Sequence, residues 1–216
     1  MNMLPPINIQ HYVSNEYLSK ERFSSYCAIL KMVLKHNYQS IADIGKGSGI
    51  MAALLTNFNI PVTTIDYADN LNPDIICDVR NLNQLKEQFD CVLCCQVLEH
   101  IPFDDFDKAV KSLIAISKKA VIITIPDRRY YLETSFKIPG FNQKNVQINL
   151  PFPIKRWNAN KNPEHLWEMN QKPYTESAVC QLIDATCARN NYQLAEHKRI
   201  DGNPTHHYFY LKSKKE

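Results

Sequence analysis

Residues 41–50 read IADIGKGSGI, and this stretch decides the fold. The chain contains only five glycines in 216 residues, and three of them, Gly45, Gly47 and Gly49, lie within these ten positions. Glycine lacks a Cβ atom, so it lets a ligand approach the backbone and adopts φ values that other residues avoid. A tight turn from a strand into a helix needs one such glycine. Three at alternate positions therefore predict a ligand-binding loop at the start of a helix.

The residues around the glycines indicate what the loop binds. A dinucleotide-binding loop reads G-x-G-x-x-G, but Ile50 occupies its third glycine position. The pattern of a phosphate-binding loop, G-x-x-x-x-G-K-S/T, is absent from the sequence. Asp43 stands two residues before the first glycine, where its carboxylate would repel a pyrophosphate and attract a cation. The sequence therefore predicts a positively charged ligand.

Short apolar runs alternate with helical periodicity along most of the chain. Residues 16–36 place an apolar stripe on one side of an amphipathic helix. Further helices are expected at 49–57, 103–117 and 175–190, and strands at 40–44, 61–66, 74–77, 89–95, 119–125, 192–200 and 206–212. This alternation predicts an α/β fold with a mostly parallel sheet and helices on both faces. Because the turn DGNP at 201–204 joins the last two strands, the final strand is expected to be antiparallel.

Composition favours one domain that spans residues 1–216. A hydrophobic content of 44% in a chain of this length suffices for one large core. Residues 1–39 are expected to form an N-terminal helical cap. Residues 126–173 hold six of the twelve prolines and no long periodic run, so they are expected to be an insertion on the substrate side.

Charge and cysteine usage set expectations for partners and location. A net charge of +3 is too small to imply a nucleic-acid or membrane partner. No apolar run approaches the roughly 18 residues that cross a bilayer, and the first residues do not read as a secretory signal. Seven cysteines, an odd number, then favour a reducing setting. We expect a soluble cytoplasmic protein, as a monomer or a homodimer.

The segment DIGKGSG resembles the first motif of class I S-adenosylmethionine-dependent methyltransferases, and three further motifs match that family in order and spacing. The resemblance covers about residues 40–126, with weaker agreement at HLWEM and at the last strand. It implies a Rossmann-like sheet of seven strands with an antiparallel last strand. It also implies S-adenosylmethionine as the cofactor and methyl transfer as the activity.

The resemblance assigns cofactor contacts to particular positions. Asp66 ends the second strand, where the family holds the ribose hydroxyls, and Asp78 in IICDVRNL corresponds to the side chain that contacts the adenine amino group. Cys95 and Gln96 in FDCVLCCQVLEHIP would lie beneath the methionine part. The implied cofactor-binding set is Asp43, Gly45, Lys46, Gly47, Gly49, Asp66, Tyr67, Asp78, Val79, Cys95 and Gln96. Because only about a dozen residues separate Asp66 from Asp78, the usual intervening helix is expected to be a loop.

Histidines near the predicted sheet edge are candidates for catalysis. His100 follows the fourth motif strand, and an imidazole titrates near neutral pH, which suits a general base; Glu99 would orient it or contact the cofactor. His165 in NPEHLWEM is the third candidate. The turn before the last strand also places His206 or His207 towards the pocket. For each histidine, a role in shaping or packing the sheet's end is the alternative.

Glu99, His100 and His165 also resemble the metal site of the small-RNA 3'-terminal 2'-O-methyltransferases. That site has two glutamates on one helical turn followed by histidines. Gln96 occupies the first glutamate position here, and an amide is a weaker ligand for a hard cation than a carboxylate. The expectation is therefore a site without metal, with metal-dependent RNA methylation as an alternative.

The remaining features bear on the acceptor. The insertion mixes aromatic and basic residues that would form a substrate wall, a dimer surface or a hydrophobic cover: Arg128, Arg129, Tyr130, Tyr131, Phe136, Phe141, Phe152, Arg156 and Trp157. Cys91, Cys94 and Cys95 lie in an expected buried strand without a second cysteine pair, which favours packing over zinc or redox roles.

The DNA amino-methylation signature D/N-P-P-Y/F/W and a Pro-Cys nucleophile are both missing after the fourth motif strand, so DNA base methylation is disfavoured. The predicted function is methyl transfer from S-adenosylmethionine to an oxygen or nitrogen of a small-molecule or sugar-type acceptor. A non-catalytic module that keeps the cofactor fold is a further alternative.

Overall fold

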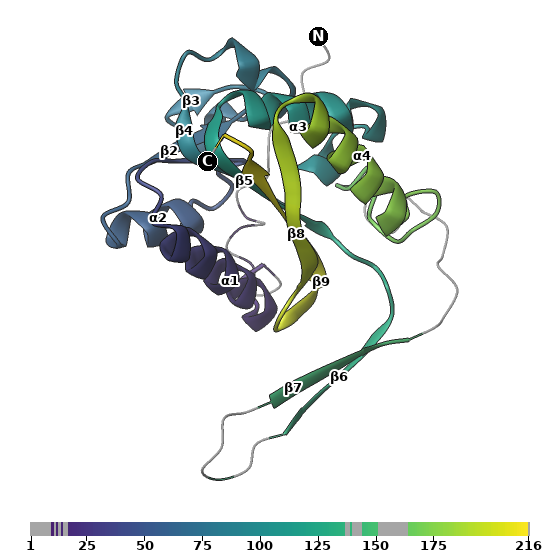
Figure 1. The fold of residues 1–216 in the computed structure, drawn as a ribbon. Coiled ribbons are helices and arrows are strands. Elements are labelled where there is room, and N and C mark those ends of the chain that lie inside the picture. Colours follow the sequence, from purple (N-terminus) through teal and green to yellow (C-terminus); the bar gives the residue numbers. More distant parts are fainter. Residues whose placement is uncertain are drawn as a thin grey trace.

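A seven-stranded sheet forms the centre of the computed structural model, which describes residues 10, 12, 14, 17–136, 139, 144–150 and 164–215 (Figure 1). Its strands are β1 (Ile41–Ile44), β2 (Val62–Asp66), β3 (Ile75–Ile76), β4 (Phe89–Cys95), β5 (Ser117–Pro126), β8 (Tyr192–Ile200) and β9 (Asn203–Ser213). The strand order is β3-β2-β1-β4-β5-β9-β8. β9 runs antiparallel to both of its neighbours, β5 and β8, and the other six strands of this sheet run in one direction. The predicted mostly parallel sheet with an antiparallel last strand is confirmed.

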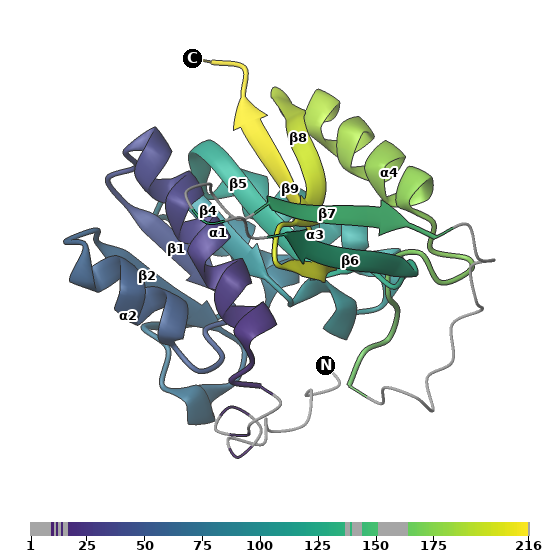
Figure 2. The same ribbon diagram turned by 90° about the horizontal axis from the view of Figure 1, so that it is seen from below.

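Helices cover both faces of this sheet, as predicted (Figure 2). The helices α1 (Lys20–His36) and α2 (Ile50–Asn57) pack on one face, and α3 (Phe106–Ala115) and α4 (Glu176–Arg189) pack on the other. Side chains alternate between the two faces along each strand. In β4, for example, Leu93 joins the apolar cluster under α1 and α2, whereas Val92 joins the cluster under α3 and α4. The core therefore consists of two apolar layers with the sheet between them.

The order of the strands fixes where a ligand binds. β1 pairs with β2 on one side and with β4 on the other. The strand order therefore changes direction between β1 and β4. Loops that leave the carboxyl ends of two such strands diverge and leave a crevice between them. The glycine stretch follows β1, and residues 96–100 follow β4, so the two motifs meet at this crevice.

Several boundaries differ from the sequence prediction. α1 begins at Lys20 rather than near residue 16, because the Ser19 side chain accepts a hydrogen bond from the Arg22 amide and caps the helix. The helix predicted at 103–117 consists of the 3₁₀ turn η5 (Phe103–Asp105) followed by α3. Between β2 and β3 the chain makes only the 3₁₀ turn η2 (Asp69–Leu71), so the expected loss of a helix there is confirmed. The other 3₁₀ helices are η3 (Val79–Gln84) and η4 (Leu98–His100).

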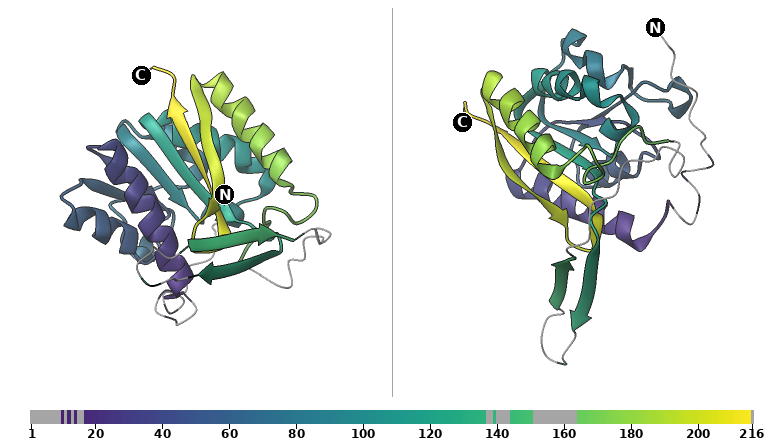
Figure 3. Two further views of the ribbon diagram at one scale, coloured as in Figure 1. Left: turned by 60° about the horizontal axis from the view of Figure 1, so that its bottom comes forward. Right: turned by 90° about the vertical axis from the view of Figure 1, so that its right-hand side faces the viewer.

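The insertion contains a hairpin that the sequence analysis did not predict. β6 (Tyr131–Phe136) and β7 (Lys144–Asn149) pair antiparallel and extend away from the sheet (Figure 3). Leu132 and Ile148 in this hairpin are more than half exposed. Exposed apolar residues of this kind do not produce the alternating buried pattern by which a strand is predicted, so the hairpin escaped prediction. The side chain of Phe136 and the residues Phe141, Phe152, Arg156 and Trp157 lie outside the described part, so the expected wall is not tested there.

No helix among the described residues is long and apolar enough to cross a membrane.

Candidate functional site

The loop after β1 has the backbone shape that requires its glycines. The φ angles of Gly45, Gly47 and Gly49 are 77°, 51° and 73°, all in the left-handed region that favours glycine. A Cβ atom at Gly45 would lie 2.3 Å from Cγ2 of Val97, so this position also lacks room for a side chain. Gly49 caps the start of α2. The unusual conformation predicted for the three glycines is confirmed.

Asp43 lies beneath this loop as a buried acid without a hydrogen-bond partner. Its side chain lines the cavity next to the loop, yet no described residue donates a hydrogen bond to it. Burial and the nearby charge of Asp66 raise the pKa of Asp43 to about 7. A carboxyl group in this state gains free energy when a cation arrives, which fits the positively charged ligand that the sequence predicts.

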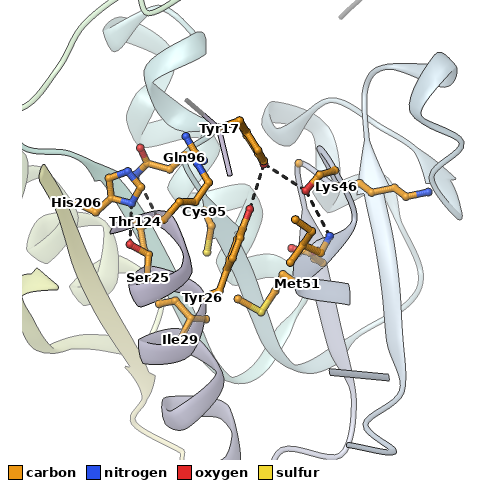
Figure 4. A pocket seen from close by; sticks show the side chains of 15 residues that line it. Tyr17, Ser25, Tyr26, Ile29, Lys46, Met51, Cys95, Gln96, Thr124 and His206 are labelled. Atoms are coloured by element: carbon orange, nitrogen blue, oxygen red, sulfur yellow. Dashed lines mark hydrogen bonds between the residues drawn. The ribbon is translucent and has the colours of Figure 1, made fainter. Parts of the chain in front are cut away.

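The cavity lies between the loops after β1 and β4 and the N-terminal half of α1 (Figure 4). It brings together five of the eleven predicted cofactor residues with residues from α1, α2, β5 and β9. The lining consists of Tyr17, Arg22, Ser25, Tyr26, Ile29, Asp43, Gly45, Lys46, Ser48, Ile50, Met51, Cys95, Gln96, Thr124 and His206. The residues predicted to contact the methionine part of the cofactor thus line the same cavity as residues of these four elements, and we call this cavity the chamber.

Gln96 enters the chamber on a strained backbone. Its φ angle of 58° is unusual for a residue with a side chain. The amide of Gln96 donates to the Thr124 carbonyl oxygen at 2.9 Å, and its side-chain nitrogen donates to the Thr124 hydroxyl at 3.3 Å. These two bonds to β5 hold the residue in place. Strain of this kind is commonly found at functional sites.

Residues of α1 and the segment before it close the chamber, and the sequence analysis missed them. The Tyr17 hydroxyl lies 3.2 Å from that of Tyr26 and 3.4 Å from the Ser48 hydroxyl (Figure 4). Ser25 points into the chamber from the buried side of α1. A signal was present, because Ser25 lies one helical turn before Ile29 on an otherwise apolar face. A polar residue on such a face indicates a polar cavity beneath the helix.

The residues predicted for the adenosine side lie outside the chamber lining. Asp66 is buried at the end of β2 and accepts hydrogen bonds from the amides of Ala68 at 3.0 Å and Gly47 at 3.5 Å. Asp78 pairs with Arg80 through both carboxylate oxygens, and this hydrogen bonding lowers its pKa. Tyr67 and Val79 follow these two acids. The adenosine contacts of all four residues remain predictions.

Lys46 and Gly47, two of the predicted cofactor residues, lie beside residues from other segments of the chain. The Lys46 ammonium donates to the Asn72 carbonyl oxygen at 2.5 Å. Tyr12 lies beside Gly47, since a Cβ atom there would be 3.3 Å from the tyrosine ring. The pKa of Tyr12 is raised, mainly by burial and also by the charge of Tyr17 and of Asp66. The segment before α1 therefore reaches the glycine loop.

Of the two neighbouring histidines in β9, only His206 lines the chamber. Its Nδ1 atom lies 3.1 Å from the Ser25 hydroxyl. Burial lowers the pKa of His206 to about 3, with smaller effects of Arg22, Arg128 and His165, so the ring is neutral at pH 7. Successive strand residues point to opposite faces, so His207 faces away from the chamber, towards α4.

Glu99, His100 and His165 come together beyond Gln96. One ligand atom of each residue lies within 4.8 Å of those of the other two. Glu99 is fully buried, and neither of its carboxylate oxygens has a hydrogen-bond partner among the described residues. Burial raises the pKa of Glu99, although the two histidines counteract this effect. A buried carboxylate without a donor is costly unless a cation neutralises it.

The hydrogen bonds of the two histidines determine which ring nitrogen is free. Nδ1 of His100 lies 2.7 Å from the Glu164 carbonyl oxygen, and Nδ1 of His165 lies 2.6 Å from Oε1 of Glu168. Both oxygens are acceptors, so each Nδ1 atom carries a proton, and in the neutral form of each ring the lone pair lies on Nε2. The cluster therefore offers two lone pairs and a carboxylate with no donor, which suits either a proton acceptor or a metal ion.

Trp167 explains how His165 reaches this cluster from the insertion. Its ring is fully buried, and its Nε1–H group donates to the carbonyl oxygens of Leu98 and Ile101 at 3.0 and 3.2 Å. The Leu166 amide donates to the Glu99 carbonyl oxygen at 2.7 Å. These bonds fix the end of the insertion against η4, and they bring His165 beside His100.

The cysteines of β4 behave as small apolar residues. Cys91 and Cys94 are buried on opposite faces of the sheet, so they cannot bind one metal ion together. Cys95 lines the chamber, and burial raises the pKa of its thiol to about 12. The preference for packing over zinc binding agrees with this arrangement.

The strand order, the glycine loop and the crevice define a Rossmann-like protein with a ligand chamber at its switch point. A model of the family described as a methyltransferase domain matches residues 18–186. The chain belongs to this family, which confirms the class I S-adenosylmethionine-dependent methyltransferase predicted from the motifs. No sequence among curated proteins matches the chain.

Solved structures of similar fold belong to several methyltransferases. An S-adenosylmethionine-dependent methyltransferase from Clostridium acetobutylicum ATCC 824 is 13% identical, with coverage of 94% of this chain and 96% of that one and a TM-score of 0.59. The 1,6-didemethyltoxoflavin-N1-methyltransferase of Burkholderia thailandensis, solved with 1,6-didemethyltoxoflavin and S-adenosylhomocysteine, is 14% identical (97% and 92% covered, TM-score 0.56). The small RNA methyltransferase HEN1 is 13% identical (89% and 25% covered, TM-score 0.61).

Proposed function

We propose that the protein transfers a methyl group from S-adenosylmethionine to an oxygen or nitrogen of a small acceptor molecule. The observation that carries this proposal is the chamber. It begins at Asp43, the glycine loop and Gln96, and it continues to His206 and Ser25. One end thus suits a cationic cofactor, and the other suits a small polar acceptor enclosed by α1.

The described residues fit the cofactor at its methionine end. Asp43 is a buried acid that receives no hydrogen bond from the described residues, and Gly45 and Lys46 of the glycine loop line the chamber beside it. Asp43 would balance the positive charge of the cofactor, and Gln96 with Cys95 would form the floor beneath its methionine part. When bound, S-adenosylmethionine supplies a methyl group on a positively charged sulfur, which the acceptor atom attacks in line.

Three histidines are available to take the acceptor's proton. His206 is neutral and lines the chamber itself. His100 and His165 each keep a free Nε2 lone pair in the adjacent cluster. A neutral imidazole at the acceptor accelerates such a transfer by about 10²- to 10⁴-fold as a general base. Glu99 would stabilise the imidazolium that forms, because its carboxylate has no other partner.

Methyl transfer is tested with the tag-free protein, S-adenosylmethionine and a panel of small acceptors that starts with nucleotide sugars. Formation of S-adenosylhomocysteine is the readout. The proposal predicts acceptor-dependent turnover that falls in a His100→Gln variant and in a His206→Gln variant. The variant His36→Gln is the matched control, because His36 stacks on Tyr38 and Tyr210 away from the chamber. Equal turnover in all four proteins would refute the roles given to His100 and His206.

A second candidate function is metal-dependent methylation of the 2'-hydroxyl at an RNA 3' end. The unpaired carboxylate of Glu99 favours it, together with the free Nε2 atoms of His100 and His165. The Glu164 carbonyl and the Glu168 carboxylate hold the two rings in the way that outer ligands hold metal-binding histidines. Here Gln96 would replace one carboxylate. A divalent metal bound there would orient and polarise the acceptor hydroxyl.

Metal dependence separates the two candidates. Under the RNA hypothesis, chelation abolishes methyl transfer to an RNA oligonucleotide, Mn²⁺ or Mg²⁺ restores it, and a periodate-oxidised 3' end is not methylated. Under the small-molecule hypothesis, RNA is not a substrate, and turnover of the small acceptor survives chelation. A Gln96→Glu variant sharpens the test, because a second carboxylate would strengthen metal binding if the cluster holds a metal.

A further inference from the structure

A second group of one glutamate and two histidines lies on the opposite face of the sheet from the chamber. Glu176 belongs to the first turn of α4, His197 to β8 and His207 to β9. Their ligand atoms all lie within 4.8 Å of one another. No part of the proposed methyl transfer uses these residues, so the inference that follows does not depend on that function.

The three ligand atoms lie close enough together to share one ion. Nδ1 of His197 lies 3.1 Å from Nε2 of His207, and Oε1 of Glu176 lies 3.7 and 3.9 Å from these two nitrogens. The first distance is that of a hydrogen bond between the two rings, whereas the last two are too long for hydrogen bonds. A point equidistant from the three atoms lies about 2.1 Å from each, which is the length of a Zn–N or Zn–O bond.

Neighbouring groups orient two of the three ligands. Nδ1 of His207 lies 3.3 Å from the Asp127 carboxylate, so its proton points to Asp127 and the Nε2 lone pair points to the cluster. Arg129 holds Oε2 of Glu176 at 2.7 Å and leaves Oε1 facing the histidines. A carboxylate that holds the far side of a metal-binding histidine is the usual arrangement around zinc.

The cluster is accessible from solvent although its base is buried. The side chain of His207 is 1% exposed, whereas those of His197 and Glu176 are 36% and 27% exposed. An ion can therefore enter past His197. The Cys180 sulfur lies 3.8 Å from both ring nitrogens of His197, so either this thiol or water is available to complete the coordination.

We propose that Glu176, His197 and His207 form a zinc-binding site that joins the start of α4 to the β8–β9 edge of the sheet. Two imidazole nitrogens and one carboxylate oxygen are ligands that Zn²⁺ accepts in tetrahedral geometry. The three ligands come from three separate elements, so the bound ion cross-links them and stabilises the folded state.

The experiment is a calorimetric Zn²⁺ titration of tag-free protein freed of metal by chelation. The Glu99 cluster is a second place where zinc could bind, so the titration is made in a His100→Gln background. In this background the proposal predicts one equivalent of bound zinc and a zinc-dependent rise in the melting temperature. Absence of that equivalent would overturn the proposal.

Two further variants in the same background locate the site. His197→Gln is expected to abolish the remaining equivalent, and Glu176→Gln is expected to weaken it about ten-fold or more. His36→Gln is the matched control and should bind zinc unchanged. Circular dichroism and urea unfolding show that each variant is folded. Unaltered zinc binding in either His197→Gln or Glu176→Gln would refute the assignment. This result is distinguishable from failure of the proposed methyl transfer, because the readout contains no enzyme activity.

Discussion

The molecule contains two clusters of the same composition, each with one glutamate and two histidines, but their surroundings differ. Glu99 beside His100 and His165 is fully buried and has no hydrogen-bond donor. Glu176 beside His197 and His207 is part exposed and paired with Arg129. The difference teaches that residue types alone do not define a site. The first cluster retains the electrostatic cost of a carboxylate without a donor, whereas neighbouring charges already hold the carboxylate and one histidine of the second cluster in the orientation that the proposed zinc ion needs.

The largest effect is expected at Asp127, the buried carboxylate that supports the second cluster. Its oxygens accept hydrogen bonds from Arg199 and Arg129, and its side chain is fully buried. We expect Asp127→Asn to lower the free energy of unfolding by about 3–5 kcal/mol, because the buried Arg199 would lose the carboxylate charge to which it donates two hydrogen bonds.

Urea unfolding at neutral pH measures this change. The matched control is Asp107→Asn, which removes an exposed pair with Arg189 and should cost less than about 1 kcal/mol. If Asp127→Asn lowered the free energy of unfolding no more than this control, the conclusion that Asp127 supports the second cluster would be wrong.

The next effect separates activity from stability at Glu99. We expect Glu99→Gln to lower kcat by about 10²-fold or more, and to leave the free energy of unfolding unchanged or increase it, because the buried charge that it removes has no partner. Turnover and urea unfolding are measured on the same preparation. A loss of stability that accompanies the loss of activity would instead assign Glu99 a structural role.

Asp43 extends the comparison, because it is another buried acid that receives no hydrogen bond from the described residues. Its pKa is about 7 in the fold and near 4 when unfolded, so the folded state binds the extra proton between these values. The stability contributed by Asp43 is full below about pH 4 and is lost as the pH rises through 7.

The expected loss of stability across this window of about three pH units is about 4 kcal/mol in the ligand-free protein. The variant Asp43→Asn should remove most of it, as measured by urea unfolding at a series of pH values. The same pH dependence in wild type and variant would contradict the burial of an unpaired acid at this position.

The smallest effect is expected at Glu176 in the absence of zinc. Glu176→Gln breaks a pair with Arg129 in which both side chains are about a quarter exposed. The free energy of unfolding should fall by about 1 kcal/mol or less, and turnover should stay close to that of the wild type. A ten-fold loss of turnover would show that the second cluster serves the reaction.

Much of the fold could be predicted because backbone patterns in the sequence are strong. Residues 89–95 and 192–200 were predicted as strands with the bounds that β4 and β8 have. The apolar run of β4 is buried on both faces of the sheet, and glycines mark the loop after β1. The β6–β7 hairpin was missed because Leu132 and Ile148 are exposed and give no alternating buried pattern.

The parts of the site that depend on local backbone conformation could be predicted from the sequence. The parts that depend on side chains from distant positions in the sequence could not. The glycine loop follows from three residues close in sequence, so its conformation could be inferred. The approach of Ser25 to His206 joins residues far apart in the chain, and only the packing of α1 against β9 creates it. Similarly, the hydrogen bonds that leave Nε2 of His100 and His165 free depend on tertiary contacts with residues 164–168.

The measurement that tests the central claim most directly is a calorimetric titration of wild type and Asp43→Asn with S-adenosylmethionine, with NAD as the comparison ligand. The account predicts micromolar binding of S-adenosylmethionine to the wild type and no binding of NAD. It also predicts an affinity at least about ten-fold weaker in the folded variant, because the variant lacks the charge that balances the cationic ligand. Absence of binding to the wild type, or equal affinity in both proteins, would contradict the placement of the cofactor at the glycine loop.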